Sequence, residues 1–124
     1  MKKLLRTFAV VLLLGGFGHS AGVIHLYVTN GVPEVNRVLL DAWVAEAQLV
    51  AGGFYFASSR AMAAGAAWKS LSVAGALTIL VYAVPFIPVL LVRAPVIFQI
   101  PPVVYLILSI FILFRATANE RTMT

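Results

Sequence analysis

Long apolar blocks constrain the fold of this chain more than any other feature. Four blocks, at about residues 8–28, 38–59, 70–92 and 96–114, are each long enough for a helix that crosses a bilayer, which takes about 20 apolar residues. Of the 124 residues, 62% are hydrophobic and 10% are charged, whereas a soluble domain has about 25% charged residues. A soluble core in so short a chain would be too small to bury this much apolar surface. The sequence therefore predicts an all-α membrane protein, a single domain of residues 1–124 with four transmembrane helices in an up-down bundle.

The basic residues predict how these helices are oriented. If the four blocks are spans, most of the basic residues fall on one side of the membrane, namely Lys2, Lys3, Arg6, Arg60, Lys69, Arg115 and Arg121. Only Arg37 and Arg93 fall on the other side. Because basic residues concentrate in cytoplasmic loops, both termini are expected in the cytoplasm, with the protein integral to the cell inner membrane. The net charge of +5 then reflects topology, and we expect the lipid bilayer, not nucleic acid, as a partner.

The first block can also be interpreted as a secretory signal peptide. Basic residues precede an apolar run, and the small residues Gly18 and Ser20 stand before Ala21 as in a cleavage site. The apolar character nevertheless continues to Val28, beyond the apolar core of about 7–15 residues that a signal peptide has. We therefore predict an uncleaved first helix.

The connections between blocks contain turn-forming residues. Asn30-Gly31 and Pro33 predict a turn after the first helix, with Pro33 in the first turn of the second helix and Glu34 near its positive end. The third and fourth helices are expected to be kinked around a loop at Arg93 because they contain Pro85, Pro88, Pro101 and Pro102.

Glycines are predicted to let helices approach closely. Gly18 and Gly22 form a GxxxG pair on a face of the first helix that also carries Gly15, and the second helix contains Gly52-Gly53. Small residues allow the backbones of membrane helices to come into contact. The alternative for the first-helix face is a smooth wall against which a flat ligand binds.

The polar residues of the second block lie mainly on one face of the expected helix. At about 100° per residue, one sector roughly 60° wide contains Glu34, Arg37, Asp41, Gln48, Gly52, Tyr55 and Ser59. Such a stripe is expected to face the interior of the bundle, because ionisable groups in a membrane pair with one another, line the interior or mark a functional path.

Depth in the membrane predicts which of these groups meet the two histidines of the first helix. A hairpin that turns near Pro33 brings residues whose numbers add to about 66 to the same depth. The expected layers are His25, Arg37 and Asp41 near the surface, and His19, Gln48 and Glu46 deeper in the membrane. A carboxylate beside an imidazole can relay a proton near neutral pH. The layers therefore predict either a proton-handling cluster or interhelical hydrogen bonds that fix the register.

Glu46 lies apart from the stripe, about 160° around the helix. Its neighbours on that face are Trp43, Leu49, Val50 and Gly53. Because an ionised carboxylate facing lipid is costly, Glu46 is expected to contact another helix of the bundle, to lie in a subunit interface or to be protonated. It is the leading functional candidate of the sequence, and a purely structural role is its alternative.

The composition excludes several kinds of chemistry. The chain has no cysteine, which excludes disulfides, thiolate metal sites, thiol catalysis and covalent c-type haem attachment. His19 and His25 are about 9 Å apart along a helix and about 120° apart around it, so they cannot both ligate one haem. No activated nucleophile or metal-ligating cluster is present, so we predict no catalytic residue and no metal site. The sequence leaves the cofactor open.

The outline, with Gly18-His19 and Gly22 in the first helix, resembles small four-helix bacterial membrane proteins such as the DoxX-like ones. It differs from the small multidrug-resistance exporters, in which the essential glutamate lies in the first helix, because Glu46 lies in the second. Three functions are compatible with the sequence. The first is a non-enzymatic accessory or scaffold subunit of a membrane complex, with other membrane subunits or a second copy as partner. The alternatives are an oligomeric proton-linked transporter that uses Glu46, Asp41 and His19, and a bundle that binds a quinone, haem or lipid.

Overall fold

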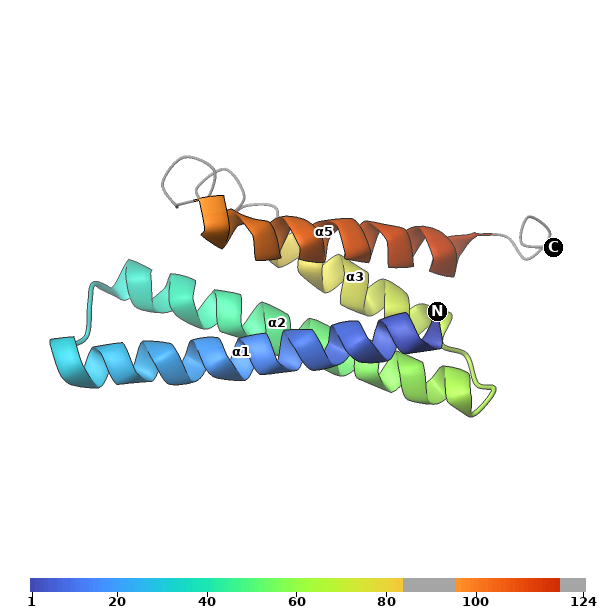
Figure 1. The fold of residues 1–124 in the computed structure, drawn as a ribbon, viewed down its shortest axis with the longest axis horizontal. Coiled ribbons are helices and arrows are strands. Elements are labelled where there is room, and N and C mark those ends of the chain that lie inside the picture. Colours follow the sequence, from blue (N-terminus) through green and yellow to red (C-terminus); the bar gives the residue numbers. More distant parts are fainter. Residues whose placement is uncertain (84–95, 119–124) are drawn as a thin grey trace.

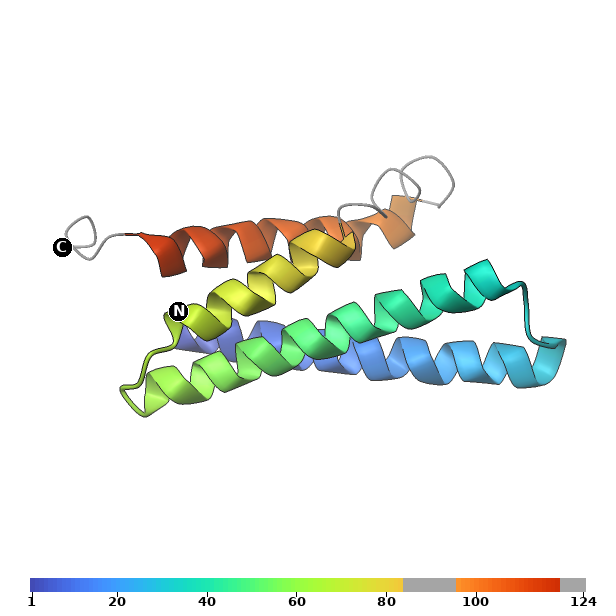
Figure 2. The same ribbon diagram turned by 180° about the vertical axis from the view of Figure 1, so that it is seen from behind.

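Four helices account for most of the described chain. The computed structural model describes residues 1–83 and 96–118, and within them the chain forms α1 (Lys2–Asn30), α2 (Val35–Ala63), α3 (Lys69–Ala83) and α5 (Val96–Thr117), with no strand. Consecutive helices run in alternating directions (Figures 1 and 2). The start of α1, the α2–α3 connection and the end of α5 therefore lie at one end of the molecule, and the α1–α2 turn lies at the other. The predicted all-α fold with four helices is confirmed.

The α1–α2 turn is shorter than expected because α1 continues to Asn30. Gly31 has a φ of 87°, a conformation that glycine adopts without steric cost, and its N–H donates to the carbonyl of Tyr27 at 3.0 Å. Pro33 lies before α2 and not in its first turn, because Glu34 is the N-cap residue; its side chain makes no capping hydrogen bond. Figure 1 shows that α1 extends beyond the level at which α2 starts, which sets the register of the hairpin.

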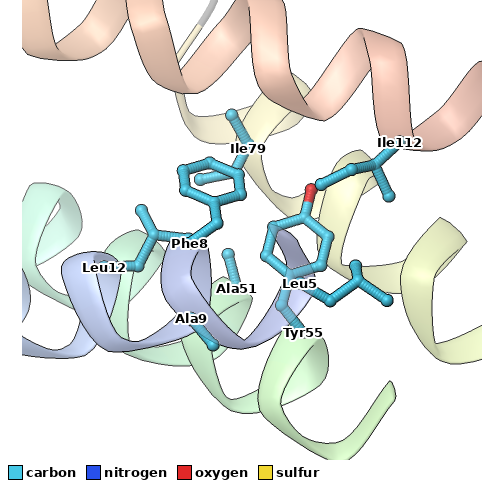
Figure 3. Close-up of a cluster of buried hydrophobic side chains, with 8 residues drawn as sticks. All are labelled: Leu5, Phe8, Ala9, Leu12, Ala51, Tyr55, Ile79 and Ile112. Atoms are coloured by element: carbon cyan, nitrogen blue, oxygen red, sulfur yellow. The ribbon is translucent and has the colours of Figure 1, made fainter. Parts of the chain in front are cut away.

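The hydrophobic core, drawn in Figure 3, involves the first half of α1, whose start is marked N in Figure 1. Its members come from all four helices and are Leu5, Phe8, Ala9, Leu12, Ala51, Tyr55, Ile79 and Ile112. The Phe8 ring lies 5.1 Å from the Tyr55 ring and 5.8 Å from the Tyr105 ring, measured between centroids. A Cβ at Gly75 of α3 would lie 2.8 Å from Cε1 of Tyr55. A side chain at position 75 would therefore displace the central aromatic ring of the core.

Helices α1 and α2 lie close together at two glycines. A Cβ at Gly16 would lie 2.7 Å from Cγ of Leu49 and 3.2 Å from the carbonyl oxygen of Ala45. A Cβ at Gly52 would lie 2.9 Å from Cγ of Leu13 and 3.2 Å from the carbonyl oxygen of Ala9. The leucine side chains can shift, but the backbone carbonyls cannot move aside. The two glycines therefore set the distance between the helices along the hairpin.

The predicted packing glycines divide into two groups. Gly15 and Gly52 face the partner helix, as expected. At Gly18, Gly22 and Gly53, by contrast, no heavy atom of the described chain lies within 4 Å of the position that a Cβ would occupy. The GxxxG pair of α1 therefore has no packing role within the described bundle.

Two of the described helices are long and apolar enough to cross a membrane: α1 and the Ile100–Thr117 part of α5. Only 22% and 17% of their most apolar segments are buried. The described part of α3 is shorter, and the rest of the predicted block at 70–92 lies outside the described residues, as do Pro85, Pro88 and the loop at Arg93. Pro101 and Pro102 lie inside α5, which continues through them.

Candidate functional site

Asp41 is the centre of a polar cluster near the α1–α2 turn. Its Oδ2 accepts a hydrogen bond from the Tyr27 hydroxyl of α1 at 2.5 Å and lies 3.4 Å from Nε of Arg37, one turn earlier in α2. The Asp41 side chain is 13% exposed and that of Arg37 is 66% exposed. The structure thus forms the expected pair of Arg37 and Asp41 and adds Tyr27, whose hydroxyl ties the two helices together through a charge-assisted bond.

His19, and not His25, is the histidine beside Asp41. Nε2 of His19 lies 3.9 Å from Oδ1 of Asp41 and is buried without a hydrogen-bond partner among the described residues. His25 is exposed, and its carbonyl oxygen accepts a hydrogen bond from the Thr29 hydroxyl. The predicted outer layer of His25, Arg37 and Asp41 is therefore wrong in one residue, because His19 takes the place of His25.

The face of α1 that meets α2 explains this difference. His19 and Tyr27 both reach Asp41, although one precedes His25 and the other follows it. Two residues along a helix turn a side chain by about 200°, so His25 points away from α2 when Tyr27 points toward it, and His25 is exposed. The prediction placed His25 at a suitable depth but on the wrong face.

The predicted inner layer does not form. Gln48 lies over Gly15, and the position of a Cβ there would be 2.5 Å from Oε1 of Gln48 and 3.4 Å from the Tyr105 hydroxyl. Oε1 of Gln48 is buried and has no hydrogen-bond partner among the described residues. His19 belongs to the Asp41 cluster, and Glu46 is exposed. The three residues thus lie in three different surroundings.

Glu46 lies on an outward face of α2. It has no hydrogen bond or ion pair within residues 1–83 and 96–118, and the exposed side chains of Trp43 and Val50 lie one turn to either side. The ring of Trp43 packs edge-on against that of Tyr82 of α3, with 5.5 Å between centroids. Gly53 continues the face without a neighbour within 4 Å. This apolar surface with one carboxylate, formed by Trp43, Glu46, Val50 and Gly53, is called the Glu46 face.

An open groove of about 730 Å³ adjoins the Asp41 cluster. It lies between the last turns of α1, the turn that follows them and the first turns of α2. Its lining is His19, Gly22, Val23, Leu26, Tyr27, Asn30, Gly31, Val32, Pro33, Arg37 and Asp41. The groove combines two opposite charges with an apolar wall, so it can bind a ligand that has both charged and apolar parts.

A second polar cluster joins helices at the other end of the bundle. The Tyr55 hydroxyl donates to Oγ of Ser109 at 2.9 Å. Ser58 donates to the carbonyl oxygen of Trp68 at 2.9 Å, and its Oγ lies 2.6 Å from that of Ser72. Ser58, Ser72 and Ser109 are all buried. These hydroxyls hold helices together.

Tyr27, Ser58 and Ser72 are not among the residues predicted from the sequence. Tyr27 could have been found as a hydroxyl at the end of the first block, within reach of a hairpin partner. The serines carry no such signal, since a single serine in an apolar helix usually bonds its own backbone, as Thr78 does with Ala74 here. Within residues 1–83 and 96–118, no three side chains of the types that ligate metals converge.

Comparisons of the chain with protein-family models, with curated proteins and with solved structures gave no match. The resemblance to DoxX-like proteins stays a prediction.

Proposed function

We propose that this protein is an integral membrane four-helix bundle that serves as a non-enzymatic accessory or scaffold subunit of a membrane complex. The membrane placement is supported by the low burial of α1 and α5. A helix in the core of a soluble protein is mostly buried, whereas large apolar side chains of these helices face outward, among them Leu14, Phe17, Ile24, Val28 and Phe114. In a bilayer these side chains contact lipid or another helix.

The distribution of charge supports an orientation with both termini in the cytoplasm. The start of α1, the α2–α3 connection and the end of α5 lie at the same end of the bundle (Figure 2). This end contains the basic residues Lys2, Lys3, Arg6, Arg60, Lys69 and Arg115. The turn end contains Arg37, which pairs with Asp41. Such an imbalance is typical of a cytoplasmic side.

The Glu46 face is the observation that carries the proposal of a subunit. A carboxylate without a partner is costly when it faces lipid, and the described chain supplies no cation beside it. Trp43 and Val50 on either side are apolar, and Gly53 leaves room for a backbone to approach. The complementary surface is a transmembrane helix of another protein that carries a basic or amide side chain at the depth of Glu46.

Site-specific crosslinking in the native membrane tests the proposal. A photoreactive amino acid in place of Val50 should capture one defined partner helix, and Glu46→Leu in the same chain should abolish the product. The matched control position is Ile107 of α5, which is 60% exposed and apolar and should give no such product. Equal capture from both positions, or capture that persists with Glu46→Leu, would contradict the proposal. Capture of a second copy of this chain would make the Glu46 face an interface between copies, and the transport assay below would then decide between the two functions.

The contact between His19 and Asp41 favours a second candidate, proton-linked transport. His19 and Asp41 are 3.9 Å apart and both line the groove, so a proton could pass between them and a molecule in the groove. Purified protein in proteoliposomes should then move substrate in response to a proton gradient, and Asp41→Asn should abolish that movement. Glu46→Gln separates the two functions. It should abolish proton-linked flux if Glu46 handles the proton, and it should leave flux unchanged if Glu46 only contacts a partner subunit.

A further inference from the structure

We propose that the groove beside Asp41 binds a phosphoethanolamine head group, with the phosphate at Arg37 and the primary ammonium at Asp41. The inference rests on the membrane placement proposed above, which brings the turn end of the hairpin to the outer interface where lipid head groups lie. A volume of about 730 Å³ falls within the range of small-molecule sites, roughly 300–1,000 Å³.

Arg37 provides the anion-binding half of the site. Its guanidinium lines the groove, its side chain is 66% exposed, and only Nε contacts Asp41, at 3.4 Å. The terminal nitrogens have no partner among the described residues. Because a guanidinium presents its N–H groups in a planar fork that matches two phosphate oxygens, Arg37 can bind a phosphate without losing Asp41.

Asp41 provides the cation-binding half. Oδ2 is occupied by the Tyr27 hydroxyl and Arg37, whereas Oδ1 accepts no hydrogen bond within the described chain. Oδ1 lies 3.9 Å from Nε2 of His19, which is also unpaired. A primary ammonium has three N–H donors and can donate one of them to Oδ1 at an ordinary hydrogen-bond length of about 2.9 Å, whereas Nε2 of His19 is buried and out of its reach. A trimethylammonium group has no N–H, so a choline head group cannot make this bond.

The apolar wall gives the lipid tail a place to lie. Val23 and Leu26 line the groove beside the charged pair, and nothing lies within 4 Å of the position of a Cβ at Gly22. Gly22 thus keeps the wall open where the glycerol and the first methylenes of a lipid would pass. Gly22 of the GxxxG pair has no packing role in the bundle, and in this arrangement its function is to leave space for the lipid.

Lipid-binding measurements on the purified full-length chain test the inference. Native mass spectrometry in detergent would compare phosphatidylethanolamine, phosphatidylcholine and phosphatidylglycerol with identical acyl chains. Phosphatidylethanolamine should bind about tenfold more tightly than phosphatidylcholine, as expected for one additional hydrogen-bonded charge pair. Equal affinity for the two lipids would overturn the inference. Competition by free phosphoethanolamine would show that the head group alone is recognised, and lack of competition would show that the tail is needed.

Variants separate the two halves of the site. Asp41→Asn should remove the preference for ethanolamine and leave the binding of phosphatidylcholine nearly unchanged, whereas Arg37→Gln should weaken both lipids to a similar extent. Arg60→Gln, at the other end of the bundle, is the control and should change neither. If Asp41→Asn does not fold, Gly22→Leu tests the same site, because it fills the groove without touching the charged pair. A retained preference in both Asp41→Asn and Gly22→Leu would overturn the inference.

These outcomes are independent of the subunit proposal. Lipid preference is measured on the isolated chain, and the crosslinking experiment concerns the Glu46 face in the native membrane. A protein without a partner can still prefer ethanolamine lipids, and a subunit with a partner can lack this preference.

Discussion

The Tyr55 hydroxyl of α2 donates a hydrogen bond to Oγ of Ser109 in α5, at 2.9 Å and in the buried interior. The two residues are 54 positions apart, so the bond joins distant parts of the chain. The Tyr55 ring also packs against Phe8 of α1 and covers Gly75 of α3. One side chain thus contacts all three of the other described helices.

Tyr55→Phe should destabilise the folded protein by about 1 kcal/mol, because it leaves the buried Ser109 hydroxyl without its donor while keeping the ring. Thermal or denaturant unfolding in detergent measures the loss. Tyr82→Phe is the matched control, since the Tyr82 hydroxyl has no described hydrogen bond and its ring contact with Trp43 would remain. Equal losses in the two variants would show that the bond contributes nothing measurable.

Alanine substitutions at glycines should have opposite effects on the two sides of the hairpin. Gly16→Ala and Gly52→Ala place a methyl group 2.7 and 2.9 Å from a leucine side chain and 3.2 Å from a backbone carbonyl of the partner helix, and they should destabilise the protein by about 1–3 kcal/mol. Gly18→Ala and Gly53→Ala enter open space and should stabilise the helices by about 0.5–1 kcal/mol. Unfolding of the purified variants measures both effects.

A loss of stability or assembly with Gly18→Ala in the native membrane, but not in the purified chain, would show a partner helix on that face. Loss in the purified chain itself would contradict the described packing.

The helices were predictable because their signal is local. Length and apolar character identify α1 and α5 directly, and the Asn30-Gly31-Pro33 run marks the turn. The polar stripe of α2 was correct for Gln48, Gly52, Tyr55 and Ser59, which face inward, whereas Glu34 and Arg37 at its start are exposed. These properties depend only on residues within one helix.

The pairings between helices were not predictable, because they depend on register and on which face of each helix meets its partner. His19 and Tyr27 reach Asp41, whereas His25 between them is exposed. Similarly, Gly16 is a contact glycine and Gly18 is not, although the GxxxG spacing favours Gly18. Two residues along a helix turn a side chain by about 200°, so a small error in register replaces the contact residues completely.

Removal of the Tyr27–Asp41 bond should loosen the turn end of the hairpin before it affects the core. Tyr27→Phe and Asp41→Ala should each speed amide hydrogen exchange in the first turns of α2, and the double variant should add little to Asp41→Ala, because both remove the same bond. Glu34→Gln is the control, since its side chain makes no capping bond. Additive effects in the double variant would show that the two groups act independently.

The buried serines should contribute unequally to the contact between α2 and α3. Ser58 bonds both the carbonyl of Trp68 and the hydroxyl of Ser72, at 2.9 and 2.6 Å. Ser58→Ala therefore removes two bonds and leaves the buried Ser72 hydroxyl without its partner, which should lower the unfolding free energy by about 1–2 kcal/mol. Ser72→Ala leaves Ser58 bonded to Trp68 and should cost less than half as much. Thr117→Ala, which removes an exposed hydroxyl bonded to its own helix, is the control and should change stability little. If Ser72→Ala proves as harmful as Ser58→Ala, the bond to the Trp68 carbonyl does not hold α3 against α2, and the hydroxyl pair alone does so.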